Sequence, residues 1–285
     1  MVPGKAEYNP PFVGFVILVF INHKLFKMKK ISLLIILVFI AKLSFSQYAV
    51  VDFFVLEDGM EKNYLELEKL WSEFHQSTVD NNSKIGWSLW KILPKKNHNE
   101  NTAHYMTVNQ FLSKDQFDLA YKKFNYSDVV KTIKTKLRGE ISSREVDKIL
   151  GKKVKKKIRT YHIKMIDQTI FAGGDLRVGD KMGMTVMIQK DKEYEKFESN
   201  VAKPFFNQQV LKGNLRWWAL TKIVDRNDEA YQDGTHFTWR VPVEGKKWER
   251  IIFENDFITD QIWKLTSGTR ETKTPQDLEL IMKTN

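Results

Sequence analysis

A short segment of the chain recurs in similar form in its second half. GWSLWKIL occupies residues 86–93, and WWALTKIV occupies residues 217–224. Four residue types recur at matching positions in the two segments: Trp87 and Trp218, Leu89 and Leu220, Lys91 and Lys222, and Ile92 and Ile223. A chain that contains one folding unit twice is restricted to the few architectures that two copies can build.

The match extends on both sides of this segment. Upstream, residues 60–79 and 191–210 both place apolar residues at spacings of three and four, which predicts an amphipathic helix in each half. Downstream, TAHYMTV at 102–108 aligns with GTHFTWR at 234–240, so that His104 matches His236. The repeat therefore covers most of the chain after residue 47.

Each half predicts the order strand, helix, strand, strand, helix, strand. The outer strands are expected at 48–56 and 158–167, and at 182–189 and 277–284, where residues suited to a pleated surface are frequent. The second helices are expected at 125–139, with Ser127 or Asp128 as N-cap, and at 249–265. We assign residues 47–167 to repeat one, 168–180 to a linker and 181–285 to repeat two.

This element order is the ferredoxin-like βαββαβ unit, an antiparallel sheet with both helices on one face. The open face of such a sheet needs a cover, and a second copy of the sheet provides one. With these two units the chain resembles the dimeric α+β barrel superfamily. The resemblance implies an α+β fold in which the antiparallel sheets of two ferredoxin-like repeats pack around a central cavity within one chain. Members include monooxygenases, haem-degrading and haem-dependent enzymes, and proteins without an assigned activity, so the fold does not select a reaction.

The N-terminal region predicts export. Residues 28–46 have a positive start, an apolar centre and small residues before Gln47, as in a secretory signal peptide. Residues 1–27 are then an upstream over-translation, and the mature protein is periplasmic or extracellular. If the segment is retained, a membrane anchor is the alternative. The chain has no cysteine, so disulfides do not contribute to its stability.

The formal net charge of +11 is unevenly distributed. Residues 1–46 carry +5 of it, so the remaining chain is only moderately basic. The most basic run, residues 151–159, is interpreted as a solvated linker whose lysines protect an edge strand. Export, and the lack of evident surface aromatic residues interleaved with basic ones, argue against nucleic acid as a partner.

Strand alternation groups the candidate ligand-binding residues on one face of each half. An antiparallel hairpin register would set Lys91 opposite His104 and Lys222 opposite His236. Two interpretations remain open: these faces line a cavity between the repeats, or the tryptophans fill the core while the lysines and histidines emerge at the solvated sheet end. The candidates are Trp87, Lys91, His104, Trp218, Lys222 and His236.

We therefore expect an exported protein of unassigned activity that binds a small apolar or aromatic molecule between the repeats. A monooxygenase or haem-associated enzyme is one alternative, and a membrane-anchored interaction module is another. No cofactor or metal is predicted from residue spacing. If haem is bound, His236 is the nominated axial ligand. A homodimer is compatible with the sequence, which does not decide whether the protein is an enzyme or whether the cavity is open.

Overall fold

The computed structural model describes residues 48–246 and 256–284. The predicted signal peptide and the first residues of the predicted helix at 249–265 lie outside these ranges. Among the helices that the structure describes, none combines the length and apolar character that a membrane span requires.

Repeat one has the predicted element order with additional helices. Its strands pair in the order β4-β1-β3-β2, and α2 follows β1 as expected. The predicted second helix is found, but its N-cap is Asn125, whose side chain accepts a hydrogen bond from the amide of Ser127 at 3.0 Å. Helix α5 was not predicted from the sequence. The elements are β1 (Tyr48–Leu56), α2 (Glu61–Asp80), β2 (Gly86–Ile92), β3 (Tyr105–Phe111), α3 (Lys114–Lys122), α4 (Tyr126–Lys136), α5 (Ser143–Leu150) and β4 (Lys155–Gln168).

Repeat two has the equivalent strand order, β6-β7-β5-β9. Its first helical region is divided, because a π-helical segment, η1, separates α6 from α7. A short strand, β8, was not predicted. It pairs with the same edge of β5 as β9 does, β8 with residues 187–189 and β9 with residues 181–184. The elements are β5 (Lys181–Gln189), α6 (Tyr194–Phe197), η1 (Glu198–Ala202), α7 (Lys203–Leu211), β6 (Leu215–Arg226), β7 (His236–Pro242), α8 (Asp256–Thr269), β8 (Arg270–Thr272) and β9 (Gln276–Lys283).

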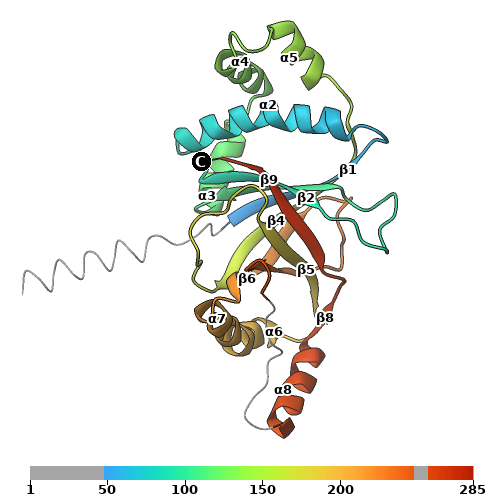
Figure 1. Ribbon diagram of the computed structural model, residues 1–285, viewed down its shortest axis with the longest axis vertical. Helices are drawn as coiled ribbons and strands as arrows, with labels where there is room; N and C mark the ends of the chain where they lie inside the picture. Colours follow the sequence, from blue (N-terminus) through green and yellow to red (C-terminus); the bar gives the residue numbers. More distant parts are fainter. Residues whose placement is uncertain (1–47, 247–255, 285) are drawn as a thin grey trace, which may run out of the picture. The chain divides into compact units, whose positions relative to one another are not determined.

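The two repeats join at two seams, each an antiparallel strand pair. At one seam β4 pairs with β6, with Lys164 opposite Lys222. At the other, β2 pairs with β9, with Trp90 opposite Leu280. With β5 also paired to β7, every strand except β8 belongs to a closed barrel (Figure 1). The expected fold class, an α+β barrel of two ferredoxin-like repeats in one chain, is confirmed.

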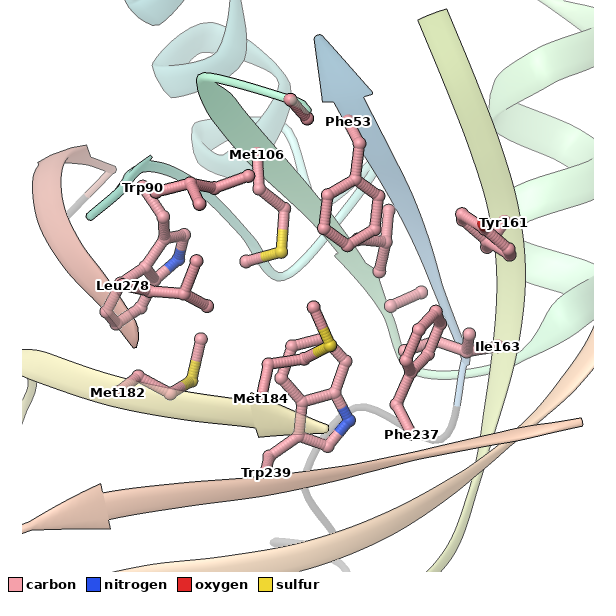
Figure 2. Close-up of a cluster of buried hydrophobic side chains, with 14 of the residues drawn as sticks. Phe53, Trp90, Met106, Tyr161, Ile163, Met182, Met184, Phe237, Trp239 and Leu278 are labelled. Carbon is pink, nitrogen blue, oxygen red and sulfur yellow. The ribbon is translucent and has the colours of Figure 1, made fainter. Parts of the chain in front are cut away.

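Large apolar side chains from both repeats fill the barrel interior (Figure 2). Phe53, Trp90 and Met106 from repeat one meet Phe237 and Trp239 from repeat two. Both indole N–H groups find partners inside, because Trp90 donates to Ser88 Oγ and Trp239 donates to Thr221 Oγ1, each at 2.9 Å. The space between the repeats is therefore occupied by protein side chains.

The outer faces of the sheets are covered by helices (Figure 1). In repeat one, α2, α4 and α5 form one apolar cluster with the outer side chains of β1, β2 and β3. In repeat two, α6 and α7 pack on β6. Strands β2 and β6 are consequently buried on both faces.

The basic run at 151–159 continues into strand β4. Residues 155–159 pair with β1 on one side, whereas β4 pairs with β6 only from Tyr161 onward. Four lysines of the run form ion pairs with glutamates within 3.5 Å. The interpretation as a linker is thus wrong for residues 155–159, which belong to β4, whereas an edge without a β6 ladder partner is present there as expected. Much of the local positive charge is balanced by the glutamates.

Candidate functional site

The candidate tryptophans lie on the outer, helix-covered face of the barrel. Trp87 packs under α2, where its ring stacks on His75 at 4.8 Å between centroids. Trp218 packs under α7, where it stacks on Phe206 at 5.3 Å. The expectation that this face looks into the space between the repeats is wrong. Side chains alternate between the two faces of a strand, and β2 and β6 carry large apolar residues on both faces. The sequence therefore does not show which face points into the barrel.

The two hairpins differ in how well the expected register holds. Lys222 lies opposite His236, as predicted. Lys91 lies opposite Tyr105, so the prediction of His104 is wrong by one residue. His104 precedes β3, and its Nδ1 accepts a hydrogen bond from the amide of Leu56 at 3.1 Å. The loop at 94–101 has no turn signature that fixes strand register.

In repeat one, Lys91 is held by a carboxylate from α2. Lys91 Nζ lies 2.8 Å from Glu61 Oε1, and the Tyr105 hydroxyl donates to the same oxygen at 2.7 Å. These two hydrogen bonds lower the pKa of Glu61. Burial, with the hydrogen bond to Glu61, raises the pKa of Tyr105. Lys91 therefore belongs to an ionic cluster at the helix-covered face.

In repeat two, Lys222 and His236 share one carboxylate, that of Glu195. Lys222 Nζ lies 2.8 Å from Glu195 Oε1, and His236 Nε2 lies 3.2 Å from the same atom. Burial by itself would raise the pKa of Glu195, but the hydrogen bonds from Lys222 and His236 outweigh it and the pKa is lowered. An ionised carboxylate only accepts, so the neutral imidazole carries its proton on Nε2.

His236 is fully buried, and both of its ring nitrogens are engaged. Nδ1 lies 2.9 Å from the Thr235 hydroxyl, and Nε2 faces Glu195. Burial lowers the pKa of His236, against the opposing effect of Glu195. The ring does not line the pocket described next. His236 therefore does not fit the axial-ligand role, since ligation would require breaking one of these contacts and moving the ring.

A pocket of about 590 Å³ opens on the outer face of repeat two. Strands β5, β6 and β7 contribute one wall, η1 and α7 a second, and α8 with β8 a third. Most of the lining is apolar or aromatic, and four threonines, two arginines and Glu198 supply its polar and charged side chains. The lining residues used below are Val201, Phe206, Trp218, Thr238, Arg240 and Trp263. Among the six sequence candidates, only Trp218 lines this pocket.

A buried ion pair forms part of the pocket wall. Glu198 Oε1 lies 2.9 Å from Arg270 Nη1, and their side chains are 3% and 16% exposed. Burial raises the pKa of Glu198, and Arg270 opposes the shift. The Arg270 guanidinium also lies 5.8 Å from the centre of the Tyr194 ring. The pocket wall thus contains a pair of opposite charges that was not predicted from the sequence.

The π-helical segment supplies several pocket residues. Glu198, Val201 and Ala202 all belong to η1 and line the pocket. A π turn inserts an extra residue into a helix and frequently occurs at functional sites. In repeat one the corresponding helix, α2, is continuous over 20 residues. The helical distortion and the pocket occur in the same repeat.

A second buried polar cluster lies in repeat one. Lys84 Nζ donates to His75 Nδ1 at 2.7 Å and to Asn109 Oδ1 at 2.8 Å. Both acceptors are neutral, and burial lowers the pKa of Lys84 to about 7. Burial, followed by the nearby Lys84, lowers the pKa of His75 well below its usual value. Within the described residues, no group of three His, Asp or Glu side chains is placed to hold a metal ion.

The closed barrel of two ferredoxin-like units, with a ligand-sized pocket between sheet and helices, defines an α+β barrel protein of the single-chain type. No protein-family model matches the chain, and no curated protein matches it. Solved structures with a similar arrangement include a protein described as a candidate monooxygenase from Lactobacillus acidophilus NCFM. It is 12% identical, with a TM-score of 0.47, and the match covers 84% of this chain and 96% of that one.

Two further structures were found with similar coverage. An anthrone oxidase-like protein is 11% identical, with a TM-score of 0.46, over 83% of this chain and 92% of that one. A haem-binding protein from Thermus thermophilus is 10% identical, with a TM-score of 0.37, over 84% of this chain and 92% of that one. Similarity at this level transfers no activity to the chain.

Proposed function

We propose that the protein binds a small, largely apolar ligand with a flat aromatic part and a polar or anionic group, in the pocket of repeat two. The observation that carries this proposal is a 590 Å³ pocket with tryptophan and phenylalanine walls and a buried Glu198–Arg270 pair. Pockets for small organic molecules have this size and this mixture of apolar surface with a few polar groups. The packed interior leaves the outer pocket as the better ligand site.

The aromatic wall favours a flat ligand. Phe206 and Trp218 are nearly parallel, with an angle of 14° between their rings. Their mutual stacking and burial hold both rings in place, so a ligand meets a preformed surface. Trp263 on α8 adds a further aromatic side chain to the lining.

The polar groups favour an oxygen-bearing ligand. Arg240 and Thr238 line the pocket from the same strand, β7. A guanidinium offers several N–H donors in one plane, which suits a carboxylate or a pair of ring oxygens. Although burial lowers the pKa of Arg240, arginine remains charged in proteins. An aromatic acid or a hydroxylated aromatic compound combines the required features.

A monooxygenase-like reaction is the second candidate, and Glu198 is the observation that favours it. Burial raises the pKa of this carboxyl group, and its residue lines the pocket. A carboxyl group of raised pKa beside a bound hydroxylated aromatic ring is suited to exchanging a proton with it. The geometry of His236 gives no comparable support to haem binding through that residue. We also propose that the protein acts outside the cytoplasm, as residues 28–46 predict.

Calorimetric titration with 2-naphthoate and with its hydroxylated analogues tests the binding proposal. Val201→Phe adds volume inside the pocket and is expected to weaken binding at least tenfold. Leu211→Phe on the neighbouring α7 adds volume at a strongly exposed position and serves as the matched control. No heat of binding for any of these compounds, or equal affinities for the two variants, would overturn the proposal.

A further inference from the structure

The turn that connects α3 to α4 exposes an unusual run of residues. Residues 121–128, with the sequence YKKFNYSD, are all exposed. Tyr121 is 73% exposed, Phe124 51% and Tyr126 50%. Leu112 and Leu119, just upstream, are also more than half exposed. The expectation that the surface lacks aromatic residues interleaved with basic ones is wrong for this segment.

The density of this apolar surface distinguishes it from ordinary surface residues. Single exposed apolar side chains are common on soluble proteins, whereas contiguous patches indicate an interaction site. Here five exposed large apolar side chains occur from Leu112 to Tyr126. We call the segment from Leu112 to Tyr126 the α3–α4 hairpin.

Packing at its base holds the hairpin in position. Tyr121 contacts Phe117 at 5.7 Å between ring centres, and Phe124 contacts Phe74 on α2 at 6.4 Å. Asn125 caps α4 through its side chain. These contacts and the cap position the turn against α2. Its eight consecutive exposed residues form a continuous surface segment.

Two lysines at the tip lack ion-pair partners among the described residues. Lys122 and Lys123 form no salt bridge there, while Lys114 is paired with Asp118 at 2.6 Å. The remaining acids nearby, Asp115 and Asp128, lie in the first turns of α3 and α4. Carboxylates at those positions interact favourably with the helix dipoles. The tip itself is therefore basic.

We propose that the α3–α4 hairpin docks the protein on an anionic lipid surface. Phenylalanine, leucine and tyrosine suit the boundary between headgroups and acyl chains. Neighbouring lysines suit the negative surface potential of such a membrane. The exposed aliphatic leucines favour a lipid surface over a nucleic acid, which would be bound by base stacking on aromatic faces along a positively charged groove. No residue of the hairpin lines the pocket of repeat two.

A fluorescent label on the hairpin tests docking in the full chain. The chain contains no cysteine, so Ser127→Cys places one environment-sensitive dye beside Phe124 and Tyr126. Vesicles of phosphatidylcholine with 30% phosphatidylglycerol are expected to shift the emission of this dye to the blue. Pure phosphatidylcholine vesicles are expected to leave it unchanged. The same dye on Leu211→Cys, an exposed α7 position, should respond to neither kind of vesicle.

Substitutions at the tip test the roles of charge and apolar contact. Lys122→Glu with Lys123→Glu, or Phe124→Ser with Tyr126→Ser, should each reduce the dye response to anionic vesicles at least tenfold. Val178→Ser, at another exposed apolar position, is the matched control and should not change it. The proposal is overturned by equal responses to neutral and anionic vesicles, or by no response to either. It is also overturned by a concentration-dependent shift without vesicles, which would indicate a second copy of the chain as the partner.

Discussion

Glu198 and Arg270 form a buried ion pair at 2.9 Å that has a counterpart in repeat one, where Glu68 and Lys155 also lie 2.9 Å apart. In each repeat the glutamate follows a buried tyrosine by four residues on the first helix. The cation comes from a strand after the later helices. The second repeat thus retains this ionic contact and places it beside a pocket.

Removing the carboxylate of Glu198 should destabilise the fold strongly. Glu198→Gln leaves the Arg270 guanidinium buried without a counter-ion, and loss of one partner of a buried pair typically costs about 3–5 kcal/mol. The partly exposed pair of Lys222 and Glu195 is the control, because Lys222→Met should cost about 0–1 kcal/mol. Urea denaturation at pH 7 measures both free energies of unfolding, and equal losses would contradict the distinction.

The two repeated tryptophans should differ in ligand binding but not in their importance for folding. Trp87→Phe and Trp218→Phe each remove volume from an outer-face cluster and should reduce the free energy of unfolding by about 0.5–3 kcal/mol. Only Trp218→Phe changes the pocket lining. Titration with 2-naphthoate should show weaker binding for this variant alone. A similar loss in Trp87→Phe would mean that the ligand binds elsewhere.

Lys84 should make stability depend on pH above neutrality. The folded protein releases the Lys84 proton near pH 7, whereas the unfolded chain holds it to about 10.5. The folded state binds fewer protons between these values, so stability should rise with pH by about 1.4 kcal/mol per unit from this group. Below pH 7 both states are protonated, and the cost of the buried ammonium is fully present.

Lys84→Met should remove this contribution. The variant should gain most over the wild type at pH 6 and below, and this advantage should shrink steadily toward pH 10. Denaturation at a series of pH values gives the difference directly. Parallel stability curves for the two proteins would show that Lys84 keeps an ordinary pKa in the folded state.

His236 should titrate below the usual range of histidine, because burial lowers its pKa. Glu195 partly offsets this effect, so Glu195→Gln should lower the pKa of His236 further. Two-dimensional NMR of the imidazole nitrogens measures both values, and the wild type should show a proton on Nε2 at pH 7. A higher pKa in Glu195→Gln than in the wild type would contradict the assigned contact.

The barrel architecture was predictable because the same pattern of strands and helices occurs twice along the chain. Each strand predicted in one half has a matching strand in the other half, so the predicted element order was correct even where single strand or helix boundaries were not. The register of one hairpin, Lys222 opposite His236, was correct. The other was displaced by one residue because the loop before Tyr105 contains no residue pair that dictates its turn.

The orientation of the strand faces could not be read from the sequence. Trp87 and Trp90 are both buried, on opposite faces of β2. The large side chains inside the barrel also come from different positions in the two repeats. Thr221 is the small equivalent of Trp90, and in repeat two the large residue is Trp239 on the neighbouring strand, which donates a hydrogen bond to Thr221. Such compensation depends on three-dimensional neighbours, which the alignment of the two halves does not contain.

The pocket was missed because it depends on contacts between distant segments. Phe206, Trp218 and Arg270 come from three elements, and neither η1 nor β8 has a distinct sequence pattern. One usable signal was present: tyrosine followed by glutamate four residues later, at 64 and 68 and again at 194 and 198. A carboxylate recurring beside an apolar helix stripe indicates a buried charge that requires a partner.

The two seams make the repeats mutually dependent, and the dependence reaches the outer clusters, where Met282 of β9 packs on the cluster of repeat one and Ile166 of β4 packs on that of repeat two. Either repeat alone would present two unsatisfied strand edges and an uncovered apolar sheet, which are hazards for aggregation. Substitutions of the side chains that meet inside the barrel are therefore expected to affect both repeats. Most contacts of each helical layer come from its own repeat, so the helices that frame the pocket of repeat two can be altered with little effect on those of repeat one.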